Sequence, residues 1–384
     1  MNIFKFRSLN TLYFLLLTII IIALYGTSLK FGYFVDDYQL IHTDTIKEIF
    51  YNPMNIVHFR PIWTASFWLT NFFGHSPVFD HFFNIFLGIL TVFTIFNFFK
   101  FFTKKPFLSF ALTAFWVCLP WTSYYFVWIS ARTDFFLIIF TLLSIQRFYE
   151  GKDFQSVLFL FLALLSKVTI ILLPLFFIHK SYKKKKIKTS LSYLFVFIIY
   201  LIFSFYFLTT FGQAEAHLKN LPVYVKLANH FAHLVEFFVQ IIIPFPFFSG
   251  FWHVLIYLSG LVLFIISISF DIKKINLDLL ACFLLTSITS AVTPELRIAG
   301  LHSIFLMICI LSIITSIKNK HLLVLGLGLI CLSYIYALFQ TKQIFNSGWI
   351  DSSKPCPAKQ SLYPNNYYQQ KRQFLIKIRK LTGL

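Results

Sequence analysis

Residues 154–188 read FQSVLFLFLALLSKVTIILLPLFFIHKSYKKKKIK, a long apolar run that ends in a dense group of lysines. Apolar runs of this kind are typical of helices that cross a membrane, and lysine clusters beside them mark its cytoplasmic side. Because Lys152 also precedes the run, both flanks are predicted to be cytoplasmic. We therefore expect two short helices that meet near the outer side, with Lys167 at the apex. A single span with an inverted tail is the alternative.

The rest of the chain continues this pattern. Of its 384 residues, 58% are hydrophobic and 12% are charged, whereas soluble domains carry about 25% charged residues. The sequence predicts an all-α, polytopic transmembrane protein with about eleven crossings and outer-face loop helices. The predicted crossings are 11–29, 78–99, 107–127, 134–148, the two halves of 154–178, 191–210, 252–270, 277–292, 298–317 and 322–339.

Two further segments and the tail complete the predicted topology. The aromatic stretch 61–73 is expected at the outer interface, and 229–246 is expected to be re-entrant or interfacial on the same side, because a full crossing there would place Lys273 outside. One membrane domain, 1–340, is followed by a short, polar, basic tail, 341–384, on the non-cytoplasmic side. The first apolar run is expected to remain as an uncleaved helix, the alternative being a signal peptide.

Charge and cysteine usage exclude several classes of function. The formal net charge is +19, but the basic residues form short clusters between apolar runs, which fits anionic lipid and not nucleic acid. The five cysteines have no spacing that suggests a disulfide framework or a metal site. The chain carries no Gly-rich nucleotide loop and no Cys/His metal set, so no cofactor is predicted.

On the predicted topology, polar and charged residues gather at the outer ends of the helices. Charges near bilayer depth are costly and often mark functional cavities. The residues are Asp36, Asp37, His58, Arg60, Arg132, Asp134, Lys167, Glu295 and Arg297, with His81 and Asn84 three apart on one face of a predicted helix.

Each of these residues also has a simpler interpretation. The pair Asp36 and Asp37 can divide base and positioning roles, or can cap a helix. Arg60 can hold a phosphate, or can anchor the chain at the interface. Asp134 can cap the helix that follows it. Lys167 lies inside an apolar run, so it needs a partner or a polar cavity, and a lipid phosphate would serve.

The other candidate residues also have two interpretations each. His81 and Asn84 can form a hydrogen bond between helices, and Glu295 can pair with Arg297 or leave that arginine to face a phosphate.

Five short motifs occur in order along the first half of the chain. They are FVDDY at 34–38, HFRPIW at 58–63, HFFN at 81–84, WISARTD at 128–134 and LLSK at 164–167. Together they resemble the GT-C membrane glycosyltransferases, and most closely the protein O-mannosyltransferase-like branch, which includes the ArnT-like enzymes. The resemblance covers about residues 11–180, and 295–303 is weakly similar to a later Glu-Arg segment of that family.

Three positions depart from the family pattern. Ala131 stands where glycine is usual, and Val168 stands where glutamate is usual, which puts the donor contacts or the activity in doubt. Arg297 belongs to a Glu-Leu-Arg sequence, so its match to the family arginine is uncertain.

The resemblance implies an inverting transferase that takes a sugar from a polyprenyl-phosphate carrier. The acceptor would be a hydroxyl of an envelope glycan, lipid or protein, on the periplasmic side of a bacterial inner membrane. Asp36, with Asp37 beside it, would act as the base. Lys167 and Arg297 first, then Arg60 and Arg132, would bind the donor phosphate without a metal. His58, His81, Asn84, Asp134 and Glu295 would support the site.

Two alternatives remain open. The first is a transporter or flippase of lipid-linked glycans, although no internal repeat of the kind common in transporters is present. The second is a non-catalytic scaffold that keeps the fold, which Val168 makes plausible.

Overall fold

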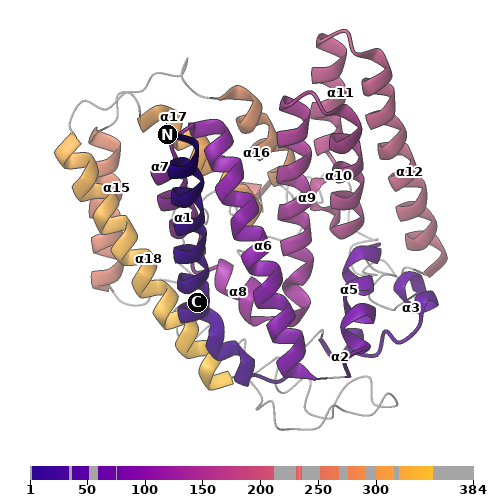
Figure 1. The fold of residues 1–384 in the computed structure, drawn as a ribbon, viewed down its shortest axis with the longest axis horizontal. Coiled ribbons are helices and arrows are strands. Elements are labelled where there is room, and N and C mark those ends of the chain that lie inside the picture. Colours follow the sequence, from indigo (N-terminus) through magenta and orange to yellow (C-terminus); the bar gives the residue numbers. More distant parts are fainter. Residues whose placement is uncertain are drawn as a thin grey trace.

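The structure, a computed structural model, contains α-helices and short 3-10 helices and no β-strand in the part of the chain that it describes (Figure 1). This confirms the predicted all-α class. The described residues are 2–33, 37–51, 59–74, 76–211, 231–232, 234–235, 251–267, 276–290, 299–314 and 320–348.

The helices of the N-terminal half carry the motif series. They are α1 (Asn2–Tyr25), η1 (Gly26–Lys30), α2 (Asp37–Leu40), α3 (Ile46–Tyr51), α5 (Pro61–Asn71), α6 (Pro77–Thr103), α7 (Pro106–Val117), α8 (Thr122–Val127), η2 (Ile129–Ala131), α9 (Arg132–Tyr149), α10 (Asp153–Ser166), η3 (Val168–Ile170), α11 (Leu173–Lys183) and α12 (Ile187–Phe211). Four more follow in the C-terminal half. They are α15 (Phe251–Ser267), α16 (Leu277–Ser290), α17 (Ala299–Ile314) and α18 (Lys320–Gly348).

Four of the described helical stretches are long and apolar enough to cross a membrane. They are Leu9–Lys30, Pro77–Thr103, Ile129–Tyr149 and Ile187–Tyr206, and six apolar helices of 10–17 residues accompany them. This agrees with a helical membrane protein. The count of about eleven crossings stays a prediction, because the shorter helices do not by themselves reach the length that a straight span needs.

The four long helices divide into outer and inner ones. In α1 and α12, 22% of the most apolar window is buried, whereas 61% is buried in α6 and 72% in the stretch that contains α9. Large apolar side chains such as Ile19 and Phe195 stand exposed on the outer pair. A surface of that composition suits contact with lipid, whereas α6 and α9 form the interior of the helix bundle.

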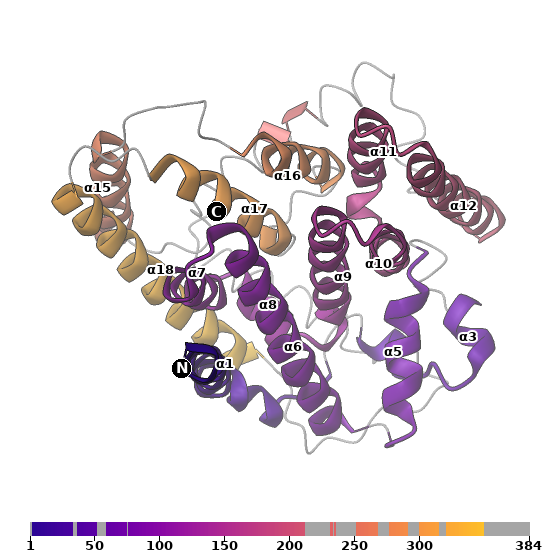
Figure 2. The ribbon, with the colours of Figure 1, turned by 45° about the horizontal axis from the view of Figure 1, so that its top comes forward.

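Helix α6 lies at the centre and packs against α1, α7, α8 and α9 (Figure 2). The close approach of α8 depends on Gly88, since a Cβ there would lie 2.1 Å from the ring of Phe126. That ring has little freedom to move, because it is fully buried and stacks on Tyr25 with centroids 4.2 Å apart. Tyr25 in turn donates a hydrogen bond to the carbonyl of Val117 at 2.7 Å.

The predicted single helix 107–127 is wrong. The structure has two helices there, α7 and α8, with a turn between Cys118 and Trp121. Pro120 lies in this turn, and because proline lacks an amide proton and clashes with the preceding turn, it interrupts a helix even where the apolar pattern continues.

The segment 154–178 forms the predicted pair of short helices, α10 and α11, with Lys167 between them. The beginning of α10 and the residues that follow α11 come together at the end opposite Lys167. There, Lys186 Nζ contacts Asp153 Oδ2 at 2.9 Å, and Thr189 Oγ1 donates to the same carboxylate. The hairpin is therefore closed at its base, which argues against the alternative of one span.

Near the C-terminus, α15 and α18 pack side by side in both views (Figures 1 and 2). Gly260 and Gly326 permit this contact, since a Cβ on either would lie within 3 Å of the carbonyl oxygen of the other. Helix α18 continues to Gly348, so the predicted boundary at residue 340 falls inside a helix. The remainder of the predicted tail and most of 229–246 lie outside the described residues.

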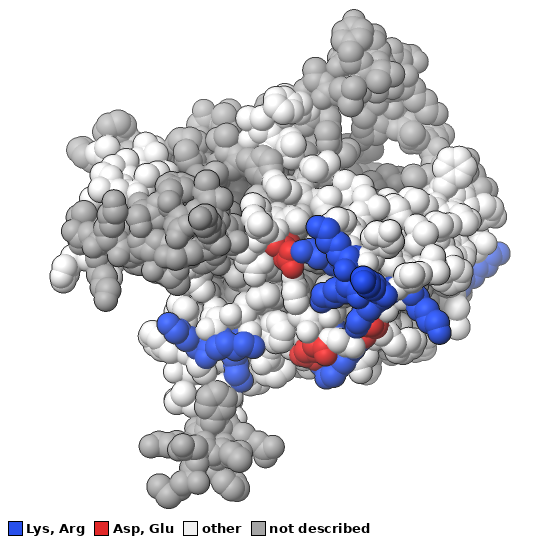
Figure 3. Space-filling model, turned by 90° about the horizontal axis from the view of Figure 1, so that it is seen from above, with Lys and Arg blue, Asp and Glu red and all other residues white. Residues whose placement is uncertain are grey.

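The two ends of the helix bundle differ in chemistry. Seen from the end that carries the last turns of α6, α9 and α11, lysines and arginines gather over the surface with few acidic residues among them (Figure 3). The opposite end carries α2, α5 and the beginnings of α6 and α9 (Figure 1). Of the candidate functional residues that the structure describes, Asp37 lies in α2, Arg60 precedes α5, His81 and Asn84 lie near the beginning of α6, and Arg132 begins α9.

Candidate functional site

The segment 128–134 links the parts of the candidate site. Trp128 is extended, the next three residues form η2, and α9 begins at Arg132. This change of direction points successive side chains toward different elements. As a result, Ser130 contacts the start of α2 and Arg132 contacts α6, whereas Thr133 and Asp134 both contact the segment Ser166–Lys167.

Ser130 holds Asp37 at the start of α2. Its backbone amide donates to Asp37 Oδ1 at 2.8 Å, and its hydroxyl donates to the same oxygen. The Asp37 side chain is completely buried. Hydrogen bonds of this kind stabilise the ionised form of a carboxylate and fix its orientation. Asp36, its predicted catalytic neighbour, lies outside the described residues.

Arg132 is fully buried and pairs with Asp80, with 2.8 Å between Nη2 and Oδ1. Its Nε donates to Asn84 Oδ1 at 3.1 Å, and its Nη1 donates to Thr70 Oγ1 at 3.3 Å. The guanidinium carbon lies 4.0 Å from the ring centroid of Phe67, which completes a largely closed environment. These contacts engage all three guanidinium nitrogens within the chain, so in this conformation Arg132 holds helices together and faces no donor phosphate.

Asp80 and Asn84 extend this cluster to neighbouring segments. The second carboxylate oxygen of Asp80 accepts from the hydroxyl of Tyr33 at 3.0 Å. The amide of Asn84 donates to backbone carbonyls of the 125–129 region, the shortest being Trp128 at 3.0 Å. A helix–helix hydrogen bond, the simpler interpretation of Asn84, is therefore what the structure shows.

Lys167 and Asp134 form a second buried ion pair, with 2.6 Å between Nζ and Oδ1. Their side chains are 7% and 6% exposed. Lys167 has an extended backbone between α10 and η3, which places it at the tip of the hairpin, and Thr133 fixes that tip by donating to the carbonyl of Ser166 at 2.7 Å. The partner that a lysine at this depth requires is therefore Asp134. Asp134 lies in the first turn of α9 and does not cap it, because the N-cap residue is Ala131, so the cap interpretation is wrong.

The other predicted residues do not belong to the two buried ion pairs. Arg60 is partly exposed at the start of α5, with its guanidinium 5.5 Å from the centroid of Trp63. His81 is completely buried, and its ring lies edge-on to Phe31 at 6.2 Å. His58, Glu295 and Arg297 lie outside the described residues, so their place relative to these pairs is still a prediction.

Asp80 is the participant that sequence reasoning missed. It directly precedes His81, and a carboxylate in the first turn of an apolar helix is an available signal, because a charge there requires a partner. Ser130 lies within the motif WISARTD, but a serine gives no comparable signal in the sequence.

Within the described residues, no three side chains of the His, Cys, Asp or Glu type come close enough to hold a metal ion. Of the carboxylates in the cluster, Asp80 and Asp134 pair with cations and Asp37 accepts from Ser130. Chemically, the cluster offers fixed acids and bases in a dry environment, where electrostatic interactions are stronger than in water.

Comparison of the sequence with protein-family models finds no matching family, and comparison with curated proteins finds no significant match. The resemblance to GT-C glycosyltransferases therefore depends on the motif series alone.

Proposed function

We propose that the chain is an inverting glycosyltransferase that moves a sugar from a polyprenyl-phosphate donor to a hydroxyl acceptor. One observation carries this proposal: the short segment 130–134 ties four of the five motif segments into one cluster, through Asp37, Asn84 and Lys167. Motifs that are far apart in sequence and meet around buried charges are what a shared site requires.

The charge distribution supports an orientation for this site. The basic end of the bundle would face the cytoplasm, because lysine and arginine are retained on that side of a membrane. The cluster around 130–134 would then work from the non-cytoplasmic side, which for a bacterial inner membrane is the periplasm. A lipid-linked donor fits this position, since cytosolic nucleotide sugars do not reach it.

In this proposal Asp36 deprotonates the acceptor hydroxyl. Asp37, which is held by Ser130, positions the acceptor beside it. The bond from the anomeric carbon to the carrier phosphate breaks as the bond to the acceptor oxygen forms, and the carrier phosphate leaves as an anion. Lys167 and Arg297 stabilise that anion, with Arg60 at the edge of the site. Donor binding would draw Lys167 partly away from Asp134, whereas Arg132 keeps its positioning role.

A second candidate, a non-catalytic scaffold, is favoured by a specific observation. Arg132 and Lys167 already have carboxylate partners inside the chain, and Val168 replaces the glutamate of the family pattern. A transporter of lipid-linked glycans, in contrast, gains no support from the described contacts.

The test is sugar transfer by the purified protein in lipid, with a panel of polyprenyl-phosphate sugars and an envelope extract as acceptor. Asp36→Asn and Asp37→Asn are expected to lose most of the rate while the protein still folds and binds the carrier. Asp44→Asn, which changes an exposed carboxylate near the same end, is the matched control and is expected to keep the rate. Carrier binding without transfer across the whole panel would support the scaffold instead, and carrier movement between leaflets would support transport.

A further inference from the structure

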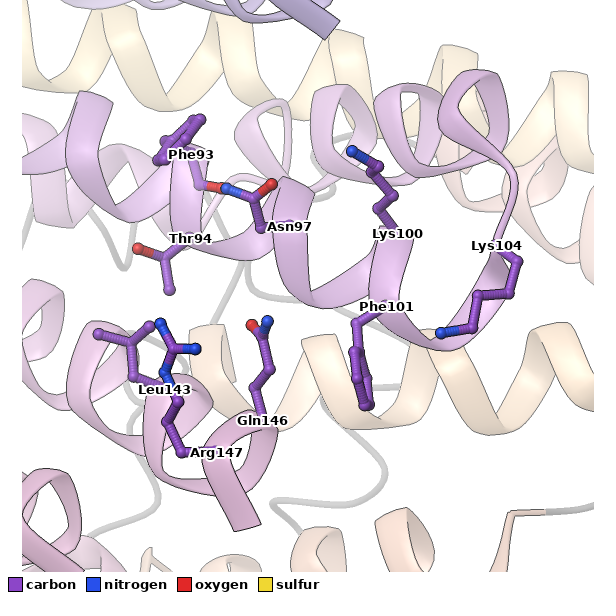
Figure 4. A pocket seen from close by; sticks show the side chains of 9 residues that line it. All are labelled: Phe93, Thr94, Asn97, Lys100, Phe101, Lys104, Leu143, Gln146 and Arg147. Carbon is purple, nitrogen blue, oxygen red and sulfur yellow. The ribbon is translucent and has the colours of Figure 1, made fainter. Parts of the chain in front are cut away.

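An open pocket of about 520 Å³ lies between α6 and α9, near the basic end of the bundle (Figure 4). Volumes of 300–1,000 Å³ are usual for pockets that bind small ligands. The predicted site residues contribute nothing to its lining, so this pocket is separate from the cluster around 130–134.

The pocket changes from apolar to cationic along its length. On α6, Phe93, Asn97 and Lys100 lie on one face, and Lys104 follows directly after the last helical residue. Phe93 lies toward the middle of the helix, while Lys104 ends it in a left-handed conformation with φ of 57°. Figure 4 shows Phe93 at one end of the pocket and both lysines at the other, where Phe101 lies beside them.

Helix α9 supplies the opposite wall and a third cation. Leu143 faces the apolar part, and Figure 4 shows the guanidinium of Arg147 beside Leu143 and Thr94, on the side of the pocket away from Lys100 and Lys104. Arg147 Nη1 contacts Glu150 at 2.6 Å, whereas its buried Nε has no hydrogen-bond partner among the described residues. Arg147 therefore contributes its positive charge to this wall through a side chain that is already paired with Glu150.

The pocket remains positive when its acidic neighbour is included. Burial raises the pKa of Glu150, but hydrogen bonds from Gln146, Lys152 and Arg147 outweigh burial and lower that pKa to about 2. Glu150 is thus ionised at neutral pH and contributes one negative charge. Lys100, Lys104 and Arg147 contribute three positive charges to the lining itself.

We propose that this pocket binds an acidic phospholipid, with the phosphate at Lys100 and Lys104, the start of an acyl chain along Phe93 and Leu143, and Arg147 adding positive charge to the opposite wall. Both helices belong to stretches that are apolar enough to cross a membrane, so the apolar part of the pocket lies where lipid chains are present. Basic pockets between membrane helices on the cytoplasmic side recognise acidic headgroups. The proposal is independent of the proposed transferase function.

The experiment measures lipid retention by native mass spectrometry of the purified full chain in detergent. Dioleoyl-phosphatidylglycerol, dioleoyl-phosphatidylcholine and glycerol 1-phosphate are added separately. The test variant is Lys100→Gln/Lys104→Gln, which leaves the Arg147–Glu150 pair intact. The control Lys105→Gln/Lys188→Gln removes the same charge from exposed positions outside the pocket.

Phosphatidylglycerol is expected to be retained in preference to phosphatidylcholine. A lysine near an anionic lipid surface contributes about 1 kcal/mol, or about 5-fold in affinity, so the test variant is expected to lose about 25-fold. The control variant is expected to lose less than about 3-fold. If the test variant does not fold, Asn97→Glu, which adds a negative charge inside the pocket, is expected to weaken retention in the same direction.

Three results would overturn the proposal: equal retention of both phospholipids, equal loss in the test and control variants, or retention of glycerol 1-phosphate as strong as that of the lipid. None of these depends on sugar transfer, so failure here leaves the proposed transferase function untouched.

Discussion

Replacing Asp80 with alanine tests whether Arg132 holds the fold or serves a ligand. The substitution removes the 2.8 Å contact with Arg132 Nη2 and the acceptor of the Thr70 and Tyr33 hydroxyls. Both ions are buried, with Asp80 2% and Arg132 0% exposed. Breaking a buried ion pair from one side costs about 3–5 kcal/mol, because the remaining charge stays in a dry environment. We therefore expect the free energy of unfolding to fall by about that amount.

The assay is unfolding of the protein by SDS in mixed micelles, followed by the helical signal in circular dichroism. Asp44→Ala, at an exposed carboxylate, is the control and is expected to change stability by less than about 0.5 kcal/mol. In a double-mutant cycle with Arg132→Met, the double variant is expected to be more stable than the sum of the single losses predicts. A loss below about 1 kcal/mol for Asp80→Ala would refute the reasoning and return Arg132 to the group of possible phosphate ligands.

Three further predictions concern other parts of the molecule. Gly88→Ala forces a Cβ against a fixed ring and is expected to cost about 1–3 kcal/mol in the same unfolding assay, whereas Gly328→Ala meets no atom within 4 Å and is expected to be neutral or stabilising. Glu150→Gln removes the negative charge that pairs with Arg147 and is expected to increase phosphatidylglycerol retention in native mass spectrometry. An unchanged retention would contradict the role of that charge in the pocket. Ser130→Ala removes one hydrogen bond to Asp37 and is expected to slow sugar transfer about 10- to 100-fold without loss of folded protein, and an unchanged rate would remove Asp37 from the proposed site.

The sequence was sufficient to predict the helical hairpin because charge and hydropathy agreed. Lysines on both flanks of 154–178 required an even number of crossings, and Lys167 marked the point of reversal. The contact between Lys186 and Asp153 closes the hairpin at its base as that argument requires. The break at Pro120, in contrast, was visible in the sequence but was outweighed by the apolar residues on both sides of it.

The partners of the buried charges could not be predicted in the same way. Arg132 and Asp80 are 52 residues apart, and their pairing depends on how α6 and α9 rotate about their axes. Apolar residues surround both helices, so periodicity does not fix that rotation. The sequence thus predicted that Lys167 needs an anionic partner, but the choice of Asp134 over a ligand required the packed structure.

The hairpin also has a consequence for how the chain enters the membrane during synthesis. Helix α10 has 14 residues and α11 has 11, which correspond to about 21 Å and about 17 Å, each shorter than a hydrocarbon core of about 30 Å. Neither helix alone reaches the length of a straight span, so we expect the two to enter the membrane together as one hairpin with Lys167 at its tip. Lys167 pairs there with Asp134, which lies 33 residues earlier in the first turn of α9, so the lysine is placed at this depth as half of an ion pair. The pairing lowers the cost of a charge that a membrane interior disfavours.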